Sequence, residues 1–223
     1  MIEFQDAGIS YGGAGLLSGL TLKLAPGSFH FLTGPSGAGK TTFLKLCYGE
    51  ILPTEGRIEI FGQDVTQASR DDIARLRRRI GVVHQDCQFL DHLPIEENIA
   101  LPLTVAGNTA EAGELAELIG WVGLSGQARA LPPSLSGGER QRAALARAVM
   151  MSPEVVLADE PTGNVDWEMS LKLLRLLVEL NRMGKTIVIA THDLNLIRAA
   201  KGQVAARVLR IAGRSVQPAG AEL

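Results

Sequence analysis

Residues 28–47 read SFHFLTGPSGAGKTTFLKLC, and this stretch decides the fold class. The apolar run at 28–33 predicts a buried strand, and the apolar spacing that follows predicts a helix from about 39 to 48. Between them, residues 34–41 match the G-x-x-x-x-G-K-[ST] pattern, which carries meaning only between a strand and a helix. The sequence therefore predicts an α/β domain in which a phosphate-binding loop joins a strand to a helix.

The glycines of this loop let backbone N–H groups turn inward around an anion, and the following helix adds the positive end of its dipole. Lys40 is placed to reach the β- and γ-phosphates of a nucleotide, and the Thr41 hydroxyl is placed to ligate Mg²⁺. The alternative, a glycine-rich turn with a solvated lysine, leaves the flanking strand and helix unexplained. The expected contacts to ATP are Gly34, Pro35, Ser36, Gly37, Ala38, Gly39, Lys40, Thr41 and Thr42.

Outward from this loop, short aliphatic runs alternate with longer amphipathic stretches, as in an α/β domain with a largely buried sheet. Closely spaced strand-like runs in the first third, with Gly and Pro between them, indicate an antiparallel portion. Strand-like runs disappear between Leu93 and Leu135, which indicates a helical insertion. The expected strands are 2–5, 20–24, 28–33, 57–61, 80–83, 155–158, 186–190 and about 204–211, and the expected helices are 39–48, 70–79, 114–122, 136–151 and 166–182.

The apolar run VVLA at 155–158 ends in Asp159 and Glu160. A buried parallel strand delivers its carboxyl end to the ligand crevice of an α/β sheet. There, one acid suits Mg²⁺ and a second suits orienting the attacking water, so we assign Asp159 to the metal and Glu160 to the general base. Alone, such a pair is commonly a helix cap or a solvated pair, but here it follows a phosphate loop in the same chain.

A second glycine pair, Gly137 and Gly138, stands at the start of a predicted helix. Ser136 with Glu139 three residues later is a capping-box pattern, which is the simpler interpretation. A capping box does not need two consecutive glycines, however, and bare backbone at a helix N-terminus suits phosphate. The chain therefore carries two candidate phosphate-binding surfaces, about 100 residues apart.

Two polar residues, Gln85 and His192, stand just past the predicted strands 80–83 and 186–190. Alone, each is more commonly structural or solvated. Beside the phosphate loop and the acid pair, both are candidates for the site at the end of the sheet.

Six motifs in order, GPSGAGKTT, VVHQD, LSGGERQR, VVLADEP, GNVD and THD, resemble the hallmarks of ABC ATPases: Walker A, Q-loop, signature, Walker B, D-loop and H-loop. The resemblance covers nearly the whole chain. It implies an α/β P-loop NTPase with a RecA-like core, an antiparallel β portion and an α-helical ABC subdomain. On this basis residues 1–223 form one ABC ATPase domain, with 1–86 and 155–223 as the core and 87–154 as the helical subdomain that ends in the signature helix.

The resemblance also implies a head-to-tail homodimer that sandwiches two ATP molecules. In such a dimer the Ser136–Glu139 loop of one subunit contacts the γ-phosphate that Lys40 of the other subunit holds. The implied catalytic residues are Lys40, Glu160 and His192, and the implied Mg²⁺ contacts are Thr41, Gln85 and Asp159. The implied contacts to nucleotide or to the dimer seam are Tyr11, which would stack on adenine, Gln85, Ser136, Gly137, Gly138, Glu139 and Asp166.

Within this family, segments such as LRRRIGVVHQD and ENIALPLTVAG are similar to the cell-division branch. That branch implies an integral membrane partner, regulation of septal cell-wall hydrolysis, and a peripheral position at the cytoplasmic face of the bacterial inner membrane. A lipoprotein-release or macrolide-type exporter ATPase is the close alternative, and a soluble ABC protein acting on nucleic acid or ribosomes is a more distant one. Two residues depart from the usual pattern, His84 in place of an aromatic residue and Val165 in place of leucine.

Composition agrees with a chain that reaches a membrane only through a partner. The formal net charge is -2, so no basic surplus indicates nucleic-acid binding. No stretch approaches the roughly 18–20 apolar residues of a membrane span, and the N-terminus resembles no secretory signal. Cys47 and Cys87 are too few for a disulfide framework or a zinc site. The cluster Arg75, Arg77, Arg78 and Arg79 is either a solvated helix face or a contact to a partner or to anionic lipid.

Overall fold

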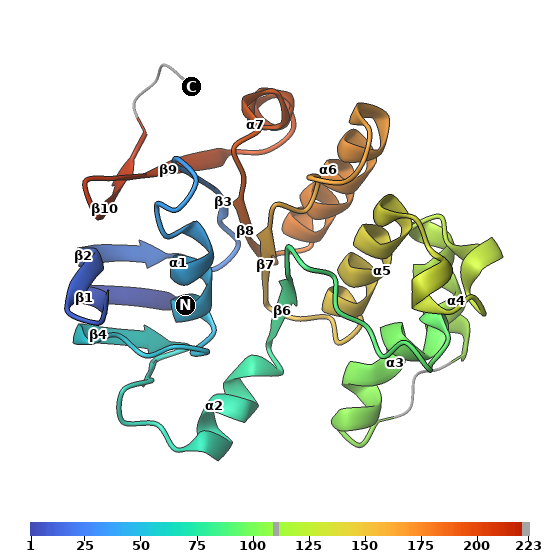
Figure 1. Cartoon of the computed structure of the whole chain (residues 1–223), viewed down its shortest axis with the longest axis horizontal. Coiled ribbons are helices and arrows are strands. Elements are labelled where there is room, and N and C mark those ends of the chain that lie inside the picture. Colours follow the sequence, from blue (N-terminus) through green and yellow to red (C-terminus); the bar gives the residue numbers. More distant parts are fainter. Residues whose placement is uncertain (109–111, 220–223) are drawn as a thin grey trace.

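The computed structural model describes residues 1–108 and 112–219. Its central element is a six-stranded sheet in the order β10-β9-β3-β8-β7-β6 (Figure 1). All strands except β10 pair in parallel, and the side chains of β3, β7 and β8 are buried throughout. The strands are β3 Phe29–Thr33, β6 Ile80–Val83, β7 Val155–Asp159, β8 Thr186–Ala190, β9 Ala206–Ala212 and β10 Ser215–Pro218.

A second sheet of four antiparallel strands, in the order β2-β1-β4-β5, confirms the predicted antiparallel portion. The predicted strands 2–5 and 20–24 were too short, because both continue into one long hairpin. Gly12 and Gly13 form its turn with φ of 56° and 83°, a conformation that glycine adopts without steric cost. The strands are β1 Ile2–Tyr11, β2 Ala14–Leu24, β4 Glu55–Ile60 and β5 Gln63–Asp64.

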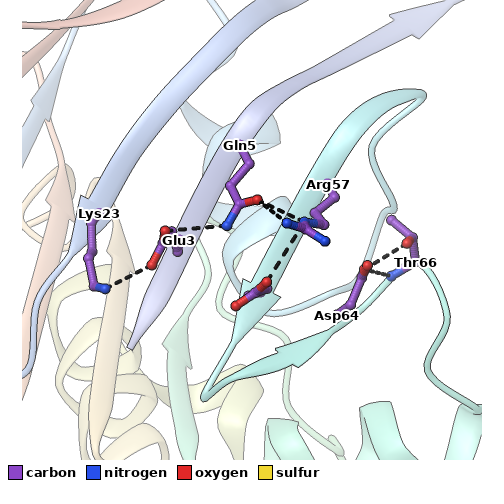
Figure 2. Close-up of polar contacts among 7 residues, drawn as sticks. Glu3, Gln5, Lys23, Arg57, Asp64 and Thr66 are labelled. Atoms are coloured by element: carbon purple, nitrogen blue, oxygen red, sulfur yellow. Dashed lines mark hydrogen bonds and ion pairs between the residues drawn. The ribbon is translucent and has the colours of Figure 1, made fainter.

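Polar side chains link neighbouring strands across one face of this antiparallel sheet (Figure 2). Lys23 Nζ on β2 lies 2.8 Å from Glu3 Oε2 on β1, its partner in the strand register. Arg57 Nε on β4 donates to Gln5 Oε1 on β1 at 2.8 Å, again between register partners. The opposite face is apolar and buried, as the alternation of a one-sided sheet requires.

Helix α1, Lys40–Cys47, packs between the two sheets. The phosphate loop therefore leads into a helix that is fixed by apolar packing. Phe43 on α1 stacks on Phe4 of β1 with ring centroids 5.0 Å apart. On the other face of the parallel sheet lie α6, Trp167–Arg182, and α7, Leu194–Lys201. The loop is therefore held by apolar packing from β1, α1 and β3.

The chain between β6 and β7 is helical, with α3 Ile95–Val105, α4 Ala112–Trp121 and α5 Gly137–Val149. Two 3₁₀ turns, Ser125–Gln127 and Pro132–Ser134, connect the last two helices. Figure 1 shows α3 and α4 on the side of the molecule away from the antiparallel sheet. Helix α5 contacts both α3 and β6, so it joins the helical region to the core. This arrangement agrees with the division proposed at 87–154, which stays a prediction.

The arginines at 75, 77, 78 and 79, in and after α2 (Arg70–Arg77), are all exposed, and three of them also bind neighbouring groups. Arg75 pairs with Asp72, while Arg77 donates to the carbonyl oxygens of Tyr48 and Gly49. Arg79 pairs with Glu154 at 2.6 Å and lies over the Phe61 ring. The sequence pattern could not show these partners because all but Asp72 lie outside the helix.

Candidate functional site

A cleft of about 550 Å³ lies where the carboxyl ends of β3, β7 and β8 meet the start of α1. It brings together Gln85, Asp159, Glu160 and His192, which are far apart in sequence. Every residue of the 34–42 loop except Ala38 lines this cleft; Ala38 packs instead against the apolar core between the sheets. The structure thus assembles the Walker A, Q-loop, Walker B and H-loop residues at one edge of the sheet, as the parallel topology predicts.

The phosphate loop has the backbone of an anion cradle. Gly37 and Gly39 have φ of 76° and 104°, which L side chains rarely adopt. A Cβ at Gly39 would lie 3.3 Å from Leu17 Cδ2, so the loop also approaches β2 closely. No side chain caps the start of α1 among the described residues, and its first N–H groups are suited to an anion.

Lys40 folds back over the loop that precedes it. Its Nζ donates to the carbonyl oxygens of Gly34 at 3.0 Å and Pro35 at 3.3 Å. These contacts place the ammonium group at the mouth of the cradle. A lysine there suits phosphate oxygens, as a point charge with three donors.

Thr41 and Asp159 form the part of the cleft that suits a divalent cation. Thr41 Oγ1 donates to Asp159 Oδ2 at 2.6 Å, and Asp159 is only 5% exposed. Burial raises the pKa of the Asp159 carboxyl, although the Thr41 hydroxyl opposes this shift. Hard oxygen donors beside a phosphate cradle fit Mg²⁺, which takes few protein ligands together with phosphate oxygens and water. The described residues contain no cluster of three His, Cys, Asp or Glu side chains that would suit another metal.

Glu160 and His192 form a polar pair in the same cleft. His192 Nδ1 lies 2.9 Å from Glu160 Oε1; the Glu160 side chain is 13% exposed and that of His192 is 77% exposed. Glu160 has φ of 46°, which is unusual for a residue with a side chain. Its N–H donates to Ala190 O at 2.9 Å, and its carbonyl accepts from Gly163 N at 3.1 Å. Strained backbone of this kind, held by hydrogen bonds on both sides, is typical of residues whose side chains have a functional role.

The Ser136–Glu139 loop lies outside this cleft. Ser136 Oγ accepts from Glu139 N at 3.3 Å, and Ser136 N donates to Glu139 Oε2 at 2.8 Å, so the capping box is real. Gly137 lines a separate hollow of about 610 Å³, together with Gln85, Arg140 and Asn164. Gln85 thus borders both cavities.

The two signature glycines also have a packing reason. A Cβ at Gly138 would lie 3.2 Å from Val165 Cγ1, and one at Gly137 would lie 3.5 Å from Asn164 Cβ. The signature loop therefore packs closely on the D-loop of its own chain. Asp166 of that D-loop caps α6 by accepting from Met169 N at 2.8 Å.

Tyr11 stands at the end of β1, 53% exposed, and does not line the cleft. Leu16 on the next strand does line it, and sequence reasoning missed this residue because a leucine carries no chemical signal. Asn164 was missed in a similar way: its motif was noted, but only Asp166 was singled out. The Gly-Gly turn before Leu16 was the one available clue, since it folds the second strand back toward the loop.

A family model described as ABC transporter matches residues 17–163, and these residues span the phosphate loop, the signature and the acid pair. The chain belongs to this family. It is therefore an ATP-binding enzyme that hydrolyses ATP.

The chain is 47% identical to the cell division ATP-binding protein FtsE of Haemophilus influenzae over 203 residues, 89% of this chain and 93% of the relative. It is 44% identical to FtsE of Escherichia coli K12, over 88% and 90% of the two chains. FtsE of Bacillus subtilis is 40% identical over 92% of both.

Solved structures of the cassette MJ0796 are similar throughout. A dimeric structure of this bacterial ABC transporter cassette has a TM-score of 0.88 at 32% identity, covering 97% of both chains. A dimeric post-hydrolysis state of the same cassette, bound to ADP and Pi, has a TM-score of 0.87 at 31% identity and the same coverage. The predicted P-loop NTPase fold class is confirmed. No helix among residues 1–108 and 112–219 has both the length and the apolar character needed to cross a bilayer.

Proposed function

We propose that this chain is the ATP-hydrolysing subunit of a cell-division complex and acts with an integral membrane partner of the FtsX type to regulate septal cell-wall hydrolysis. The observation that carries the proposal is its 40–47% identity, over about nine-tenths of the chain, to proteins named for cell division in distantly related bacteria. On this proposal the chain lies at the cytoplasmic face of the inner membrane and is held there by its partner.

Within one subunit, we assign ATP to the cleft and give each residue one task. Lys40 and the backbone of 34–42 hold the β- and γ-phosphates, while Glu160 accepts a proton from the attacking water. His192, hydrogen-bonded to Glu160, orients that carboxylate and contacts the γ-phosphate. Thr41, Asp159 and Gln85 would hold Mg²⁺, which would neutralise charge on the phosphate oxygens.

A second copy completes the site. The Ser136–Glu139 loop does not line the cleft of its own chain, and its two glycines carry no side chain at the start of α5. In a head-to-tail homodimer this loop contacts the γ-phosphate in the other subunit, with Asp166 at the seam. The dimeric MJ0796 structures support a homodimer.

The membrane partner has a candidate docking groove of about 540 Å³ between α2, β6, α3 and α5. Apolar Leu101 and Val105 line it, and Val105 is 72% exposed. Arg77, Arg78 and Arg147 add positive charge at the same groove. An amphipathic segment with apolar and acidic residues would be complementary to this surface.

Co-purification from native membranes tests the proposal. Glu160→Gln with ATP is the bait because slowed hydrolysis should hold the nucleotide-bound dimer and its partner together. Recovery of a small membrane protein with a large extracytoplasmic loop, along with division proteins, is the expected result. Recovery of a permease with a lipoprotein- or solute-handling component would make the chain an exporter ATPase, with its ATPase chemistry unchanged.

A further inference from the structure

The segment between β6 and α3, residues 84–94, contains no helix or strand, yet it carries Gln85 between the two cavities. Its second half is held by Asn98 of α3, which is fully buried. Asn98 Oδ1 accepts from Leu90 N at 2.8 Å, and its Nδ2 donates to Leu93 O at 2.9 Å. The first half, which lies next to Gln85, is held by a different helix.

That helix is α5, and it uses two arginines seven residues apart. Arg140 Nη2 donates to Cys87 O at 3.1 Å, and Arg147 Nη1 donates to Gln88 O at 2.7 Å. Both guanidinium groups face the Phe89 ring, at 5.7 Å and 4.6 Å from its centroid. Residues seven apart share a helix face, so both arginines reach the same segment.

The contacts suit positioning better than charge pairing. Among the described residues, neither Arg140 nor Arg147 forms an ion pair with a carboxylate. Their partners are backbone carbonyls and an aromatic face, both of which depend on the planar guanidinium. Cys87 adds a weaker contact to the same helix, its Sγ donating to Gln141 Oε1 at 3.3 Å.

The same helix begins with the Ser136–Glu139 loop, and Arg140 is the residue immediately after it. The contacts therefore join two surfaces that meet different nucleotides in the proposed dimer. Gln85 borders the ATP cleft of its own chain, whereas the signature loop would meet the ATP of the second copy. A rigid connection between them would make a displacement at one surface appear at the other.

We propose that Arg147, with Arg140 and Phe89, clamps the Gln85 segment to α5, so that Gln85 and the Ser136–Glu139 loop move as one body. Arg147 is a positioning residue: it touches no nucleotide and acts through Gln85 and the signature loop. The inference rests on the proposed roles of these two elements. Beyond those roles, Arg147, Arg140 and Phe89 connect the two elements, and Arg147 affects turnover although it does not contact the phosphates.

The test compares Arg147→Ala, Arg147→Lys and Phe89→Leu in the purified full chain. Arg79→Ala is the matched control, because Arg79 also stacks on an aromatic ring and pairs through its guanidinium, but its partners Phe61 and Glu154 lie outside this segment. Thermal stability, ATP affinity, kcat and KM are measured for each variant. Amide hydrogen exchange of residues 86–89 reports whether this half of the segment is held.

We expect Arg147→Ala to lower kcat by roughly 10- to 100-fold, the scale of a misplacement of about 1 Å. ATP affinity should stay within about 2-fold, since the phosphate loop is untouched. Residues 86–89 should exchange faster. Arg147→Lys, which keeps the charge and can still donate but lacks the planar guanidinium, should recover part of the activity, and Phe89→Leu should lower kcat less than Arg147→Ala. Arg79→Ala should show none of the kinetic change.

A kcat for Arg147→Ala equal to that of Arg79→Ala, or unchanged exchange of residues 86–89, would overturn the clamp. Gln85→Ala separates this failure from failure of the proposed site. If Gln85→Ala lowers kcat and Arg147→Ala does not, the clamp is wrong and the role of Gln85 stands. If Gln85→Ala leaves kcat unchanged, the role of Gln85 is wrong and the clamp's effect on catalysis is overturned with it.

Discussion

Two glycine-rich loops precede helices in this chain, one before α1 and one at the start of α5. The first, residues 34–42, meets Asp159, Glu160 and His192 in a single cleft. The second, residues 136–139, engages its own Ser136 and Glu139 side chains in a capping box and lines a different hollow. The comparison teaches that similar local sequence can line a cleft in one place and cap a helix in another, because only the first loop lies at the carboxyl ends of the parallel strands.

The largest effect is expected from a change in the first loop's cleft that slows hydrolysis but leaves ATP bound. Glu160→Gln keeps the size of the side chain and an oxygen near His192, so nucleotide binding should persist. Loss of the general base should lower hydrolysis by at least ~10²-fold. Steady-state phosphate release and ATP titration measure the two quantities, and near-normal turnover would remove Glu160 from its assigned role.

A smaller effect is expected when the first loop loses the positively charged side chain of Lys40. Lys40→Ala should weaken ATP binding roughly 10- to 100-fold, the scale of losing a charge-assisted hydrogen bond of about 1.5–3 kcal/mol. Lys45→Ala is the matched control, because Lys45 lies on the same helix but pairs with Glu50 at 2.8 Å. Equal ATP affinities for the two variants would show that Lys40 does not bind the phosphates.

The second loop is tested by a substitution that preserves its capping role. Ser136→Asp retains a good helix cap but places a carboxylate where the phosphate of a second copy would lie. Thermal stability and ATP affinity should stay close to those of the unaltered chain, while turnover falls about 10-fold or more, as expected on losing an electrostatic contact in the transition state. Ser136→Asn, a neutral cap, is the control. Turnover that is the same in both variants would mean that the loop only caps α5.

The smallest effect concerns β3, the strand that leads into the first loop. Burial, with Arg207 nearby, lowers the pKa of His30 from 6.5 to about 4. The unfolded chain therefore binds a proton at higher pH than the folded chain, so this contribution to stability is complete above about pH 6.5 and is lost as pH falls toward 4. His30→Met should flatten this part of the pH dependence in urea unfolding. A parallel decline in both proteins would exclude His30 as its cause.

Sequence pattern predicted the buried strands best, because 155–158 and 186–190 are unbroken aliphatic runs that suit only a covered sheet. It shortened β1 and β2 because glycines and small residues interrupt their alternation, and register shifts break the pairing of the two strands between Phe4 and Ser10. It predicted the polar lining of the cleft, since parallel strands bring their carboxyl ends to one edge. It missed Leu16, whose contribution is shape rather than chemistry.

Long-range side-chain partners were the other limit. The four arginines between 75 and 79 read as one charged face, yet Arg77 and Arg79 bind groups more than 25 residues away in sequence. The contacts of Arg140 and Arg147 to residues 87–89 could not be predicted from the sequence either. Helical spacing says which residues share a face, but it does not say which loop that face will meet.

Complementation in mixed dimers tests the central claim most directly, that one loop of each chain completes the site of the other. Lys40→Ala chains and Ser136→Asp chains are mixed in equal amounts, at an ATP concentration that saturates the unaltered chain but not the Lys40→Ala chain. Turnover should recover to roughly a quarter of the unaltered level, since half of randomly paired dimers are mixed and each keeps one intact composite site. A mixture no more active than the average of the two separate variants would place both loops at the same nucleotide within one chain and contradict the account.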